Sequence, residues 1–122
     1  MEMIQGLKLQ YNFTEDKKDI DSIQMARCLI DNENILNELY KFIGCNMVDC
    51  VKFNDRIDIW CDDEALLKNG IAGVAIIGEK QLVGNLIFIG HDGEGNCASL
   101  SEGEFNEVIE EIGNSKVGYN FL

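Results

Sequence analysis

Histidine and cysteine are the residue types in this chain that most often carry acid–base, nucleophilic or metal chemistry. The one histidine, His91, stands next to Asp92 with neither a nucleophile nor a second metal ligand beside it. The five cysteines include no C-x-x-C pair, and the closest spacing is that of Cys45 and Cys50. The others are Cys28, Cys61 and Cys97. These patterns predict neither a catalytic centre nor a structural zinc site, and we expect the protein not to be an enzyme.

A glycine-rich acidic loop, Asp92-Gly93-Glu94-Gly95-Asn96, follows the histidine. Its oxygen-bearing side chains alternate as they do at the start of a calcium-binding loop, but the twelfth position, which needs a bidentate Glu, is Gly103. A phosphate-binding glycine loop leads directly into a helix, whereas the helix signal here begins only near Ser101. We therefore expect a connection between a strand and a helix, without a metal or cofactor.

Net charge is the strongest functional signal in the chain. The 10 basic and 22 acidic residues give a net charge of -12, so we do not expect direct DNA or RNA binding through a basic face. The carboxylates occur in short groups: Asp62, Asp63 and Glu64; Asp92 and Glu94; and Glu102, Glu104, Glu107, Glu110 and Glu111. Such groups either keep a surface solvated or, when spaced like phosphates, occupy the basic groove of a nucleic-acid enzyme.

Residues 47–62 predict a β-hairpin that would carry a contact surface. Two alternating apolar stretches are joined by Asn54-Asp55, which favours a two-residue turn and pairs Phe53 with Arg56. The core face would then carry Val48, Cys50, Ile57, Ile59 and Cys61. The contact residues that we expect, most of them on the opposite face, are Phe53, Arg56, Asp58, Trp60, Asp62, Asp63 and Glu64. Aromatic residues with an arginine are typical of an interface core, although a helix packed on that side of the sheet would explain the pattern equally well.

Apolar periodicity predicts the remaining strands. Residues 3–13 alternate with the period of a half-buried strand, and residues 22–30, which are ambiguous between a strand and a helical turn, are interpreted as its partner. The apolar runs 71–77 and 82–89 predict a second hairpin in the centre of the sheet. Residues 62–69 predict a short helix or a loop.

Two helices complete the predicted fold. Apolar residues at helical spacing, with Gly44 behind them, predict a helix over 31–43. Ser101 and Glu104 form a capping box in front of a helix over 102–112. A chain of 122 residues suits one hydrophobic core. We therefore expect a single α+β domain over residues 1–122, with an antiparallel sheet of about five to six strands and two main helices.

Composition indicates a cytoplasmic protein of a bacterium with an AT-rich genome. Residues with GC-rich codons are rare: there are no prolines, two arginines and five alanines, against fifteen isoleucines and twelve asparagines. Residues 1–10 lack the basic and apolar regions of a secretory signal, and no apolar run approaches the length of a membrane span. An odd number of cysteines in apolar contexts fits reduced thiols.

The middle of the chain resembles a known family. A helix that ends at Gly44 is followed by the hairpin, by the acidic turn 62–64, and by a strand whose sequence runs Leu82-Val83-Gly84-Asn85 and reaches Gly90 after four apolar residues. Over roughly residues 30 to 112 this arrangement is similar to an uncharacterised domain family, a domain of unknown function, of phages and other mobile elements of low-GC bacteria. The family's usual Gly-Leu-Pro-x-Asn stretch is replaced here by residues 67–72, which lack proline. The resemblance implies a small phage-encoded accessory protein and brings no site residues.

Three hypotheses for function follow. The first is a phage protein that counters a host defence system by stoichiometric binding, as an acidic inhibitor of a CRISPR-type or other nucleic-acid-processing effector. The second is a sponge that sequesters a nucleotide second messenger, with the base stacked on Trp60 and phosphates held by Arg56. The third is a structural or accessory protein. The expected partner is a host defence protein or the nucleotide signal, with no membrane, and a homo-oligomer is compatible with each hypothesis.

Overall fold

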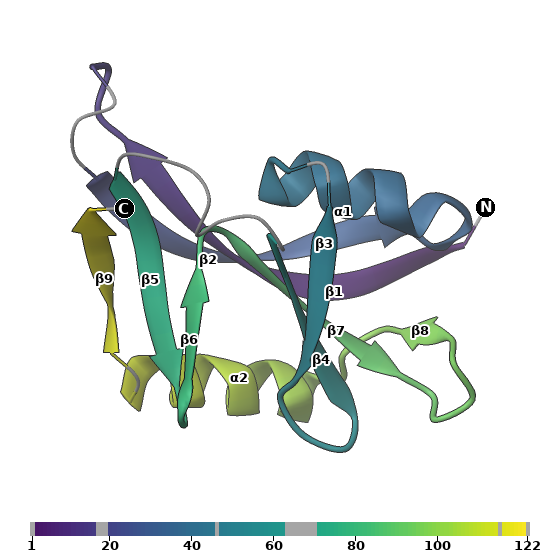
Figure 1. Cartoon of the computed structure of the whole chain (residues 1–122). Coiled ribbons are helices and arrows are strands. Elements are labelled where there is room, and N and C mark those ends of the chain that lie inside the picture. The colour runs from purple at the N-terminus through teal and green to yellow at the C-terminus, as the bar shows by residue number, and fades with distance from the viewer. Residues whose placement is uncertain (1, 17–19, 46, 63–70, 115, 122) are drawn as a thin grey trace.

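The computed structural model describes residues 2–16, 20–45, 47–62, 71–114 and 116–121 as an α+β fold (Figure 1). The strands are β1 (Met3–Phe13), β2 (Ile20–Asp31), β3 (Val48–Lys52), β4 (Ile57–Asp62), β5 (Ile71–Ile77), β6 (Lys80–Val83), β7 (Leu86–His91), β8 (Cys97–Ala98) and β9 (Lys116–Phe121). The helices are the 3-10 turn η1 (Asn32–Asn34), α1 (Ile35–Ile43) and α2 (Glu102–Asn114). The predicted fold class and the number of strands in the main sheet are confirmed.

The strands form two antiparallel sheets. The six-stranded main sheet has the order β2-β1-β7-β4-β3, with β8 paired to the end of β7. The second sheet has three strands in the order β6-β5-β9. The long β1–β2 hairpin runs from Met3 opposite Asp31 to Phe13 opposite Ile20, which confirms that residues 22–30 are a strand.

Alternation along the strands sends side chains into two cores, one on each face of the main sheet. The first core joins Leu7 and Ile59 of the main sheet to Phe105 and Val108 of α2, and Leu82 of the small sheet packs into it as well. The second core lies on the opposite face, beneath α1 (Figure 1). Its buried members are Ile4, Cys28, Ile30, Leu39, Ile43, Ile87 and Ile89.

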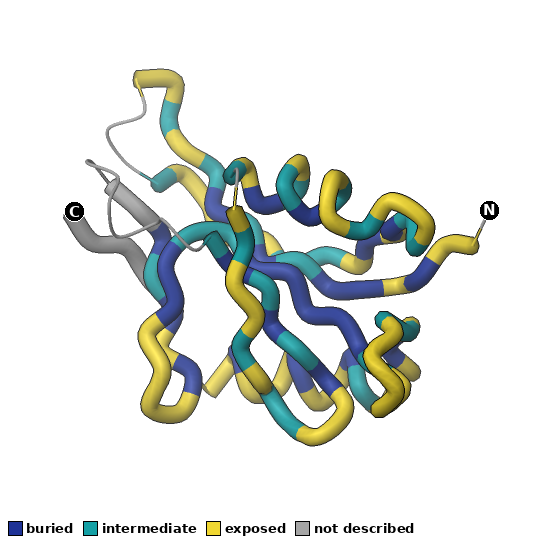
Figure 2. The backbone as a smooth tube through the Cα atoms, turned by 45° about the vertical axis from the view of Figure 1, so that its right-hand side comes forward, coloured by how far each residue is buried: buried dark blue, intermediate teal, exposed yellow. Residues whose placement is uncertain are grey.

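Strand β7 lies at the centre of this arrangement. Its residues from Leu86 to Gly90 are all buried, so both of its faces are covered (Figure 2). A continuous apolar run is the pattern expected of a strand with two covered faces, because neither side of the pleat meets water. The main sheet is therefore a middle layer, with α1 on one side and α2 on the other.

Local capping explains where the helices begin and end. Asp31 caps η1, its side chain accepting a hydrogen bond of 3.0 Å from the Glu33 N–H. Gly44, with φ 79°, closes α1 in the left-handed conformation and donates its N–H to the Tyr40 carbonyl at 2.8 Å, as the sequence predicts. No helix among the described residues is long and apolar enough to span a membrane.

The predicted hairpin of residues 71–77 with 82–89 is wrong in its second half. Strand β5 lies between the four residues of β6 and strand β9 in the small sheet, whereas β7 belongs to the main sheet. Gly84, with φ 87°, ends the β5–β6 pairing by donating its N–H to the Gly73 carbonyl at 2.8 Å. Asn85 then accepts a hydrogen bond from the Tyr11 N–H at 2.9 Å, which ties the start of β7 to β1. One apolar run is thus divided between two sheets.

The hairpin of β3 and β4 forms, but its register differs from the prediction by one residue. Val51 lies opposite Ile59, and Lys52 lies opposite Asp58. The loop therefore spans residues 53–56 and is longer than the predicted two-residue turn at Asn54-Asp55. The Asn54 side-chain oxygen accepts hydrogen bonds from the N–H groups of Arg56 and Ile57, both at 2.8 Å, and this Asx turn sets the loop length.

Candidate functional site

The register shift divides the predicted contact surface between the two faces of the sheet, because a one-residue slip moves side chains to the other face. Phe53 packs against the first core, where its ring meets Phe88 edge-on, with 5.8 Å between ring centroids. Trp60 packs against the second core, beneath α1. The grouping of Val48 and Cys50 with Ile59 is likewise wrong, since alternation places these two residues on the face of Trp60.

Trp60 is part of the packed interior. It is partly buried, and its indole Nε1 is buried without a hydrogen-bond partner among the described atoms. Of the two explanations for the hairpin pattern, a covering helix is therefore the one observed. Asp62 is half-buried at the end of β4, and Asp63 and Glu64 lie outside the described residues.

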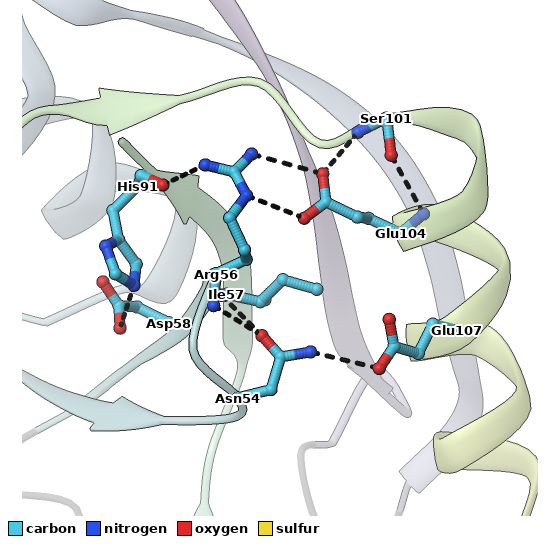
Figure 3. A network of polar contacts seen from close by, with 8 residues as sticks. All are labelled: Asn54, Arg56, Ile57, Asp58, His91, Ser101, Glu104 and Glu107. Atoms are coloured by element: carbon cyan, nitrogen blue, oxygen red, sulfur yellow. Dashed lines mark hydrogen bonds and ion pairs between the residues drawn. The ribbon is translucent and has the colours of Figure 1, made fainter. Parts of the chain in front are cut away.

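Arg56 joins the hairpin loop to the start of α2 (Figure 3). Its guanidinium Nε lies 3.4 Å from a carboxylate oxygen of Glu104, and its Nη1 donates a hydrogen bond to the His91 carbonyl. Arg56 therefore reaches the α2 side of the sheet, whereas Trp60 packs on the α1 side. The sponge hypothesis requires one nucleotide to contact both residues, but Arg56 and Trp60 lie on opposite sides of the sheet.

Glu104 forms an ion pair with Arg56 and also caps the N-terminal end of α2. Its side chain accepts a hydrogen bond from the Ser101 N–H at 2.9 Å, while the Ser101 hydroxyl accepts one from the Glu104 N–H at 3.2 Å. This is the capping box that the sequence predicts. Partial burial alone would raise the pKa of Glu104, but the hydrogen bonds from Ser101 and the charge of Arg56 outweigh it and lower the pKa.

A second contact holds the hairpin loop against α2. The Asn54 side-chain nitrogen donates a hydrogen bond of 3.1 Å to Glu107 (Figure 3). Asn54 thus shapes the loop through its oxygen and anchors the loop through its nitrogen. The hairpin tip and the first two turns of α2 form one continuous, hydrogen-bonded surface.

Two thiols, those of Cys50 and Cys97, lie near the carboxylate of Asp58. Asp58 lies 3.9 Å from the Nε2 of His91, and both side chains are about one quarter exposed. Burial, followed by the charges of Asp58 and Asp49, raises the pKa of Cys50 to about 11. Burial and the charge of Asp58 also raise the pKa of Cys97, so both groups are protonated thiols at neutral pH. Among the residues that the structure describes, no group of three His, Cys, Asp or Glu side chains could hold a metal ion.

Several basic side chains are engaged within the molecule. Arg27 makes two hydrogen bonds of 2.7 Å to Glu102 and stacks over Phe105, 4.2 Å from the ring centroid. Lys52 lies 3.0 Å from Asp55, and Arg56 is held by Glu104. Each of these cations neutralises one carboxylate of its own chain. The acidic surplus is therefore left to face solvent.

Part of that surplus lies on α2. We define the α2 carboxylates as Glu102, Glu104, Glu107, Glu110 and Glu111; the helix contains no basic residue. Phe105, Val108 and Ile112 point into the core, so Glu107, Glu110 and Glu111 are exposed. Glu102 and Glu111, the first and last of these residues, are nine positions apart, which is about 14 Å along the helix axis. One DNA strand carries about four phosphates over that length.

Comparison with protein-family models gives a match over residues 15–113. The matching family is described as a domain of unknown function, DUF3846. The chain belongs to the DUF3846 family. The resemblance inferred from residues 30 to 112 is thereby confirmed as membership of a family without an assigned function, and the match begins earlier, before β2. No match was found among curated proteins or solved structures.

In this DUF3846 chain the tryptophan of the hairpin favours a predicted contact surface there, and that prediction leaves out the acidic face of α2. The signal for it is present in the sequence. The capping box at Ser101 and Glu104 fixes where α2 begins, and the helical spacing of Phe105, Val108 and Ile112 then fixes which side faces the core. The other side is left with carboxylates and no lysine or arginine.

Proposed function

We propose that the protein acts by stoichiometric binding, with the α2 carboxylates and the adjoining hairpin tip docking on a basic, nucleic-acid-binding groove of a partner protein. The observation that carries this proposal is the group of exposed carboxylates on α2, Glu107, Glu110 and Glu111. They extend a line of acidic residues that begins with Glu102 and Glu104, which are paired with Arg27 and Arg56, and the five residues are spaced about as closely as phosphates along a DNA strand. A rigid row of charges complements such a groove and steers the encounter. The contacts of Asn54 and Arg56 hold the tip in place beside the row.

The electrostatics of α2 also supports its acidic face as the binding surface. The C-terminal end of a helix carries a partial negative charge, so acidic residues there are unfavourable. Glu110 and Glu111 nevertheless lie near that end of α2, and the last turn has no basic residue. The helix dipole therefore disfavours these two charges, which is consistent with a role in binding.

The finer assignment rests on the family resemblance and on composition. We propose that this is a phage or mobile-element protein that works in the host cytoplasm and inhibits a CRISPR-type or other nucleic-acid-processing defence effector. Such effectors hold their nucleic acids in positively charged channels. The net charge of -12 suits an occupant of such a channel.

The test is a titration of the purified protein into DNA-cleavage reactions of a panel of guide-loaded CRISPR nucleases. We expect cleavage by at least one effector to fall in proportion to added protein until the two are equimolar. The triple variant Glu107→Gln, Glu110→Gln, Glu111→Gln should need at least tenfold more protein for the same inhibition. Circular dichroism should show that the variant remains folded, because these three side chains are exposed.

A matched control separates surface position from total charge. The variant Glu2→Gln, Glu33→Gln, Glu94→Gln removes the same three charges from exposed positions outside α2. We expect it to inhibit as the wild type does. Equal loss in both triple variants would mean that only net charge matters, and unchanged inhibition by the α2 variant would place the contact surface elsewhere. If no nucleic-acid-processing effector is inhibited, the assignment to such effectors is wrong.

A further inference from the structure

A groove separates the outer strands of the two sheets. Its volume is about 510 Å³, and it is lined by residues 49–52 of β3, by β6, and by Cys61 and Asp62 of β4. Strand β3 is the last strand of the main sheet, and β6 is the last strand of the small one. Within the described part of the chain neither has a strand partner on its outer side.

The direction of the β3 main-chain groups follows from the hairpin register. In an antiparallel pair, residues that exchange hydrogen bonds alternate with residues that do not. The Phe53 N–H donates to the Ile57 carbonyl at 3.0 Å, so the bonded β3 positions are the odd-numbered ones. The N–H and carbonyl groups of Cys50 and Lys52 therefore point away from β4 and into the groove.

The same argument orients β6. The Gly84 N–H donates to the Gly73 carbonyl at 2.8 Å, which makes Leu82 and Lys80 the bonded positions in the register with β5. The main-chain groups of Gln81 and Val83 consequently point outward. Two strand edges of four residues each thus face the same groove, and each is about 13 Å long.

Two side chains of the protein itself occupy part of the β3 edge. The Asp49 carboxylate accepts a hydrogen bond from the outward Cys50 N–H at 2.9 Å. Lys80 reaches across from β6 and donates to the outward Lys52 carbonyl at 3.4 Å. These are the contacts that an added strand would make, provided here by exposed side chains that can rotate away.

We propose that this groove binds an extended peptide segment of a partner protein, which pairs with the outer edge of β3 at Cys50 and Lys52. Main-chain hydrogen bonding to an exposed edge is a recurrent mode of peptide recognition. Charges set the orientation: Asp49 and Asp62 lie at the end of the groove where β3 begins, and Lys80, which reaches the Lys52 carbonyl, lies at the hairpin end. An antiparallel peptide therefore needs an acidic residue at its N-terminal end and a basic residue at its C-terminal end.

This site is separate from the α2 carboxylates, so it stands or falls independently of the proposed inhibition. The probe is the peptide acetyl-Glu-Thr-Val-Thr-Val-Lys-amide, titrated into the full-length, isotope-labelled protein and followed by amide NMR shifts. We expect saturable shifts at Cys50, Lys52, Gln81 and Val83, with amides of α1 unchanged. The same peptide with Gln in place of Glu and Lys should bind about fivefold more weakly, because two charge pairs are lost.

Backbone pairing is tested from both partners. N-methylation of alternate peptide residues on the edge that faces β3 should abolish the shifts without any change in the protein. In the protein, Cys50→Pro removes one outward N–H and leaves the β3–β4 ladder intact, as proline allows on edge strands, whereas Cys50→Ala keeps that N–H. We expect loss of binding with proline and wild-type binding with alanine.

Three peptide-binding results would overturn the proposal. They are an absence of saturable shifts at millimolar peptide, equal binding by the N-methylated peptide, and shifts confined to residues outside the groove. If Cys50→Pro fails to fold, the N-methylated peptide decides the question alone. Concentration-dependent dimerisation through β3 in place of peptide binding would assign the groove to a second copy of the chain and would also contradict the proposal.

Discussion

Tyr11 combines a tight ring contact with an unsatisfied hydroxyl. Its ring lies against the backbone of Gly73 in the small sheet, where an added Cβ would come within 2.2 Å of the ring atoms. Glycine is therefore required at position 73 for the two sheets to pack as they do. The Tyr11 hydroxyl is buried with no hydrogen-bond partner among the described atoms, and burial raises the pKa of Tyr11 to about 12.

Replacing Tyr11 by Phe should stabilise the protein. A buried hydroxyl without a partner costs about 1 kcal/mol or more, and phenylalanine keeps the ring while removing it. Because the folded-state pKa lies above the unfolded value near 10, the wild type loses stability as pH rises from about 10 towards 12, whereas Tyr11→Phe does not. Urea unfolding of both proteins at pH 7 and pH 11 tests this. A variant less stable than the wild type at both values would show that the hydroxyl has a partner.

Trp60→Ala should weaken the fold before it weakens any binding. The side chain packs against the second core beneath α1, so truncation removes these contacts and should lower the free energy of unfolding by about 3 kcal/mol. Trp60→Phe, which keeps most of the volume, should cost less than half of that. Urea denaturation midpoints give both values. A fully stable Trp60→Ala variant would contradict the packing described here.

The sequence pattern predicts where helices and strands lie better than it predicts which strands pair and in which register. Gly44 and the Ser101–Glu104 box locate helix ends because these signals act within a few residues. The hairpin register was missed because it depends on one side chain: the Asn54 oxygen accepts two loop N–H groups and enlarges the turn. The division of residues 82–89 was missed because Gly84 interrupts the run only through its backbone angle.

The prediction of the candidate site is limited in the same way, because a local pattern does not reveal which elements pack together. Composition and the grouping of the carboxylates predicted an acidic surface, but alternation within β4 could not say whether Trp60 faced solvent or a helix. The run from Leu86 to Ile89 contained the missing information, since an apolar β7 predicts a sheet covered on both faces. Helix packing is a long-range property, and it decided which acidic groups remain exposed.

The junction between the hairpin and α2 gives a prediction for pH. The folded-state pKa of Glu104 is lowered, so its contribution to stability is complete above its ordinary pKa near 4.5 and is lost as pH falls through the folded value. Glu104→Gln should destabilise the protein by about 1 kcal/mol at pH 7, and the difference from wild type should shrink at pH 3. Unfolding curves at both pH values measure this. The matched control Glu110→Gln should show no such loss, and a pH-independent difference would contradict the role of the charge.

Across the whole molecule, the acidic surplus opposes compaction. Like charges repel in a chain of net charge -12, and salt screens that repulsion at distances beyond about 8 Å. We expect the melting temperature to rise when sodium chloride is increased from low to physiological concentration. Association with a basic partner should slow over the same range, because screening removes electrostatic steering. Salt thus favours the fold and disfavours the proposed encounter.

A charge reversal on α2 should show how much its acidic residues lower the stability of the fold. Glu110→Lys places a cation in the last turns of the helix, where it favours the helix dipole, and should stabilise the protein by about 0.5 kcal/mol. Glu110→Gln should give a smaller gain. Thermal unfolding at low salt compares the three proteins. A melting temperature below that of wild type for Glu110→Lys would show that Glu110 contributes to folded stability.

The position of the single tryptophan gives the protein a one-sided optical reporter. Trp60 packs only in the core beneath α1, and the α2 carboxylates lie across the sheet from it. Its emission therefore reports the solvation of the α1 layer. A partner that docks on α2 should leave the emission maximum unchanged, whereas detachment of α1 should shift it to longer wavelength while the far side of the molecule remains intact. Intrinsic fluorescence can in this way distinguish binding from partial unfolding without an added label.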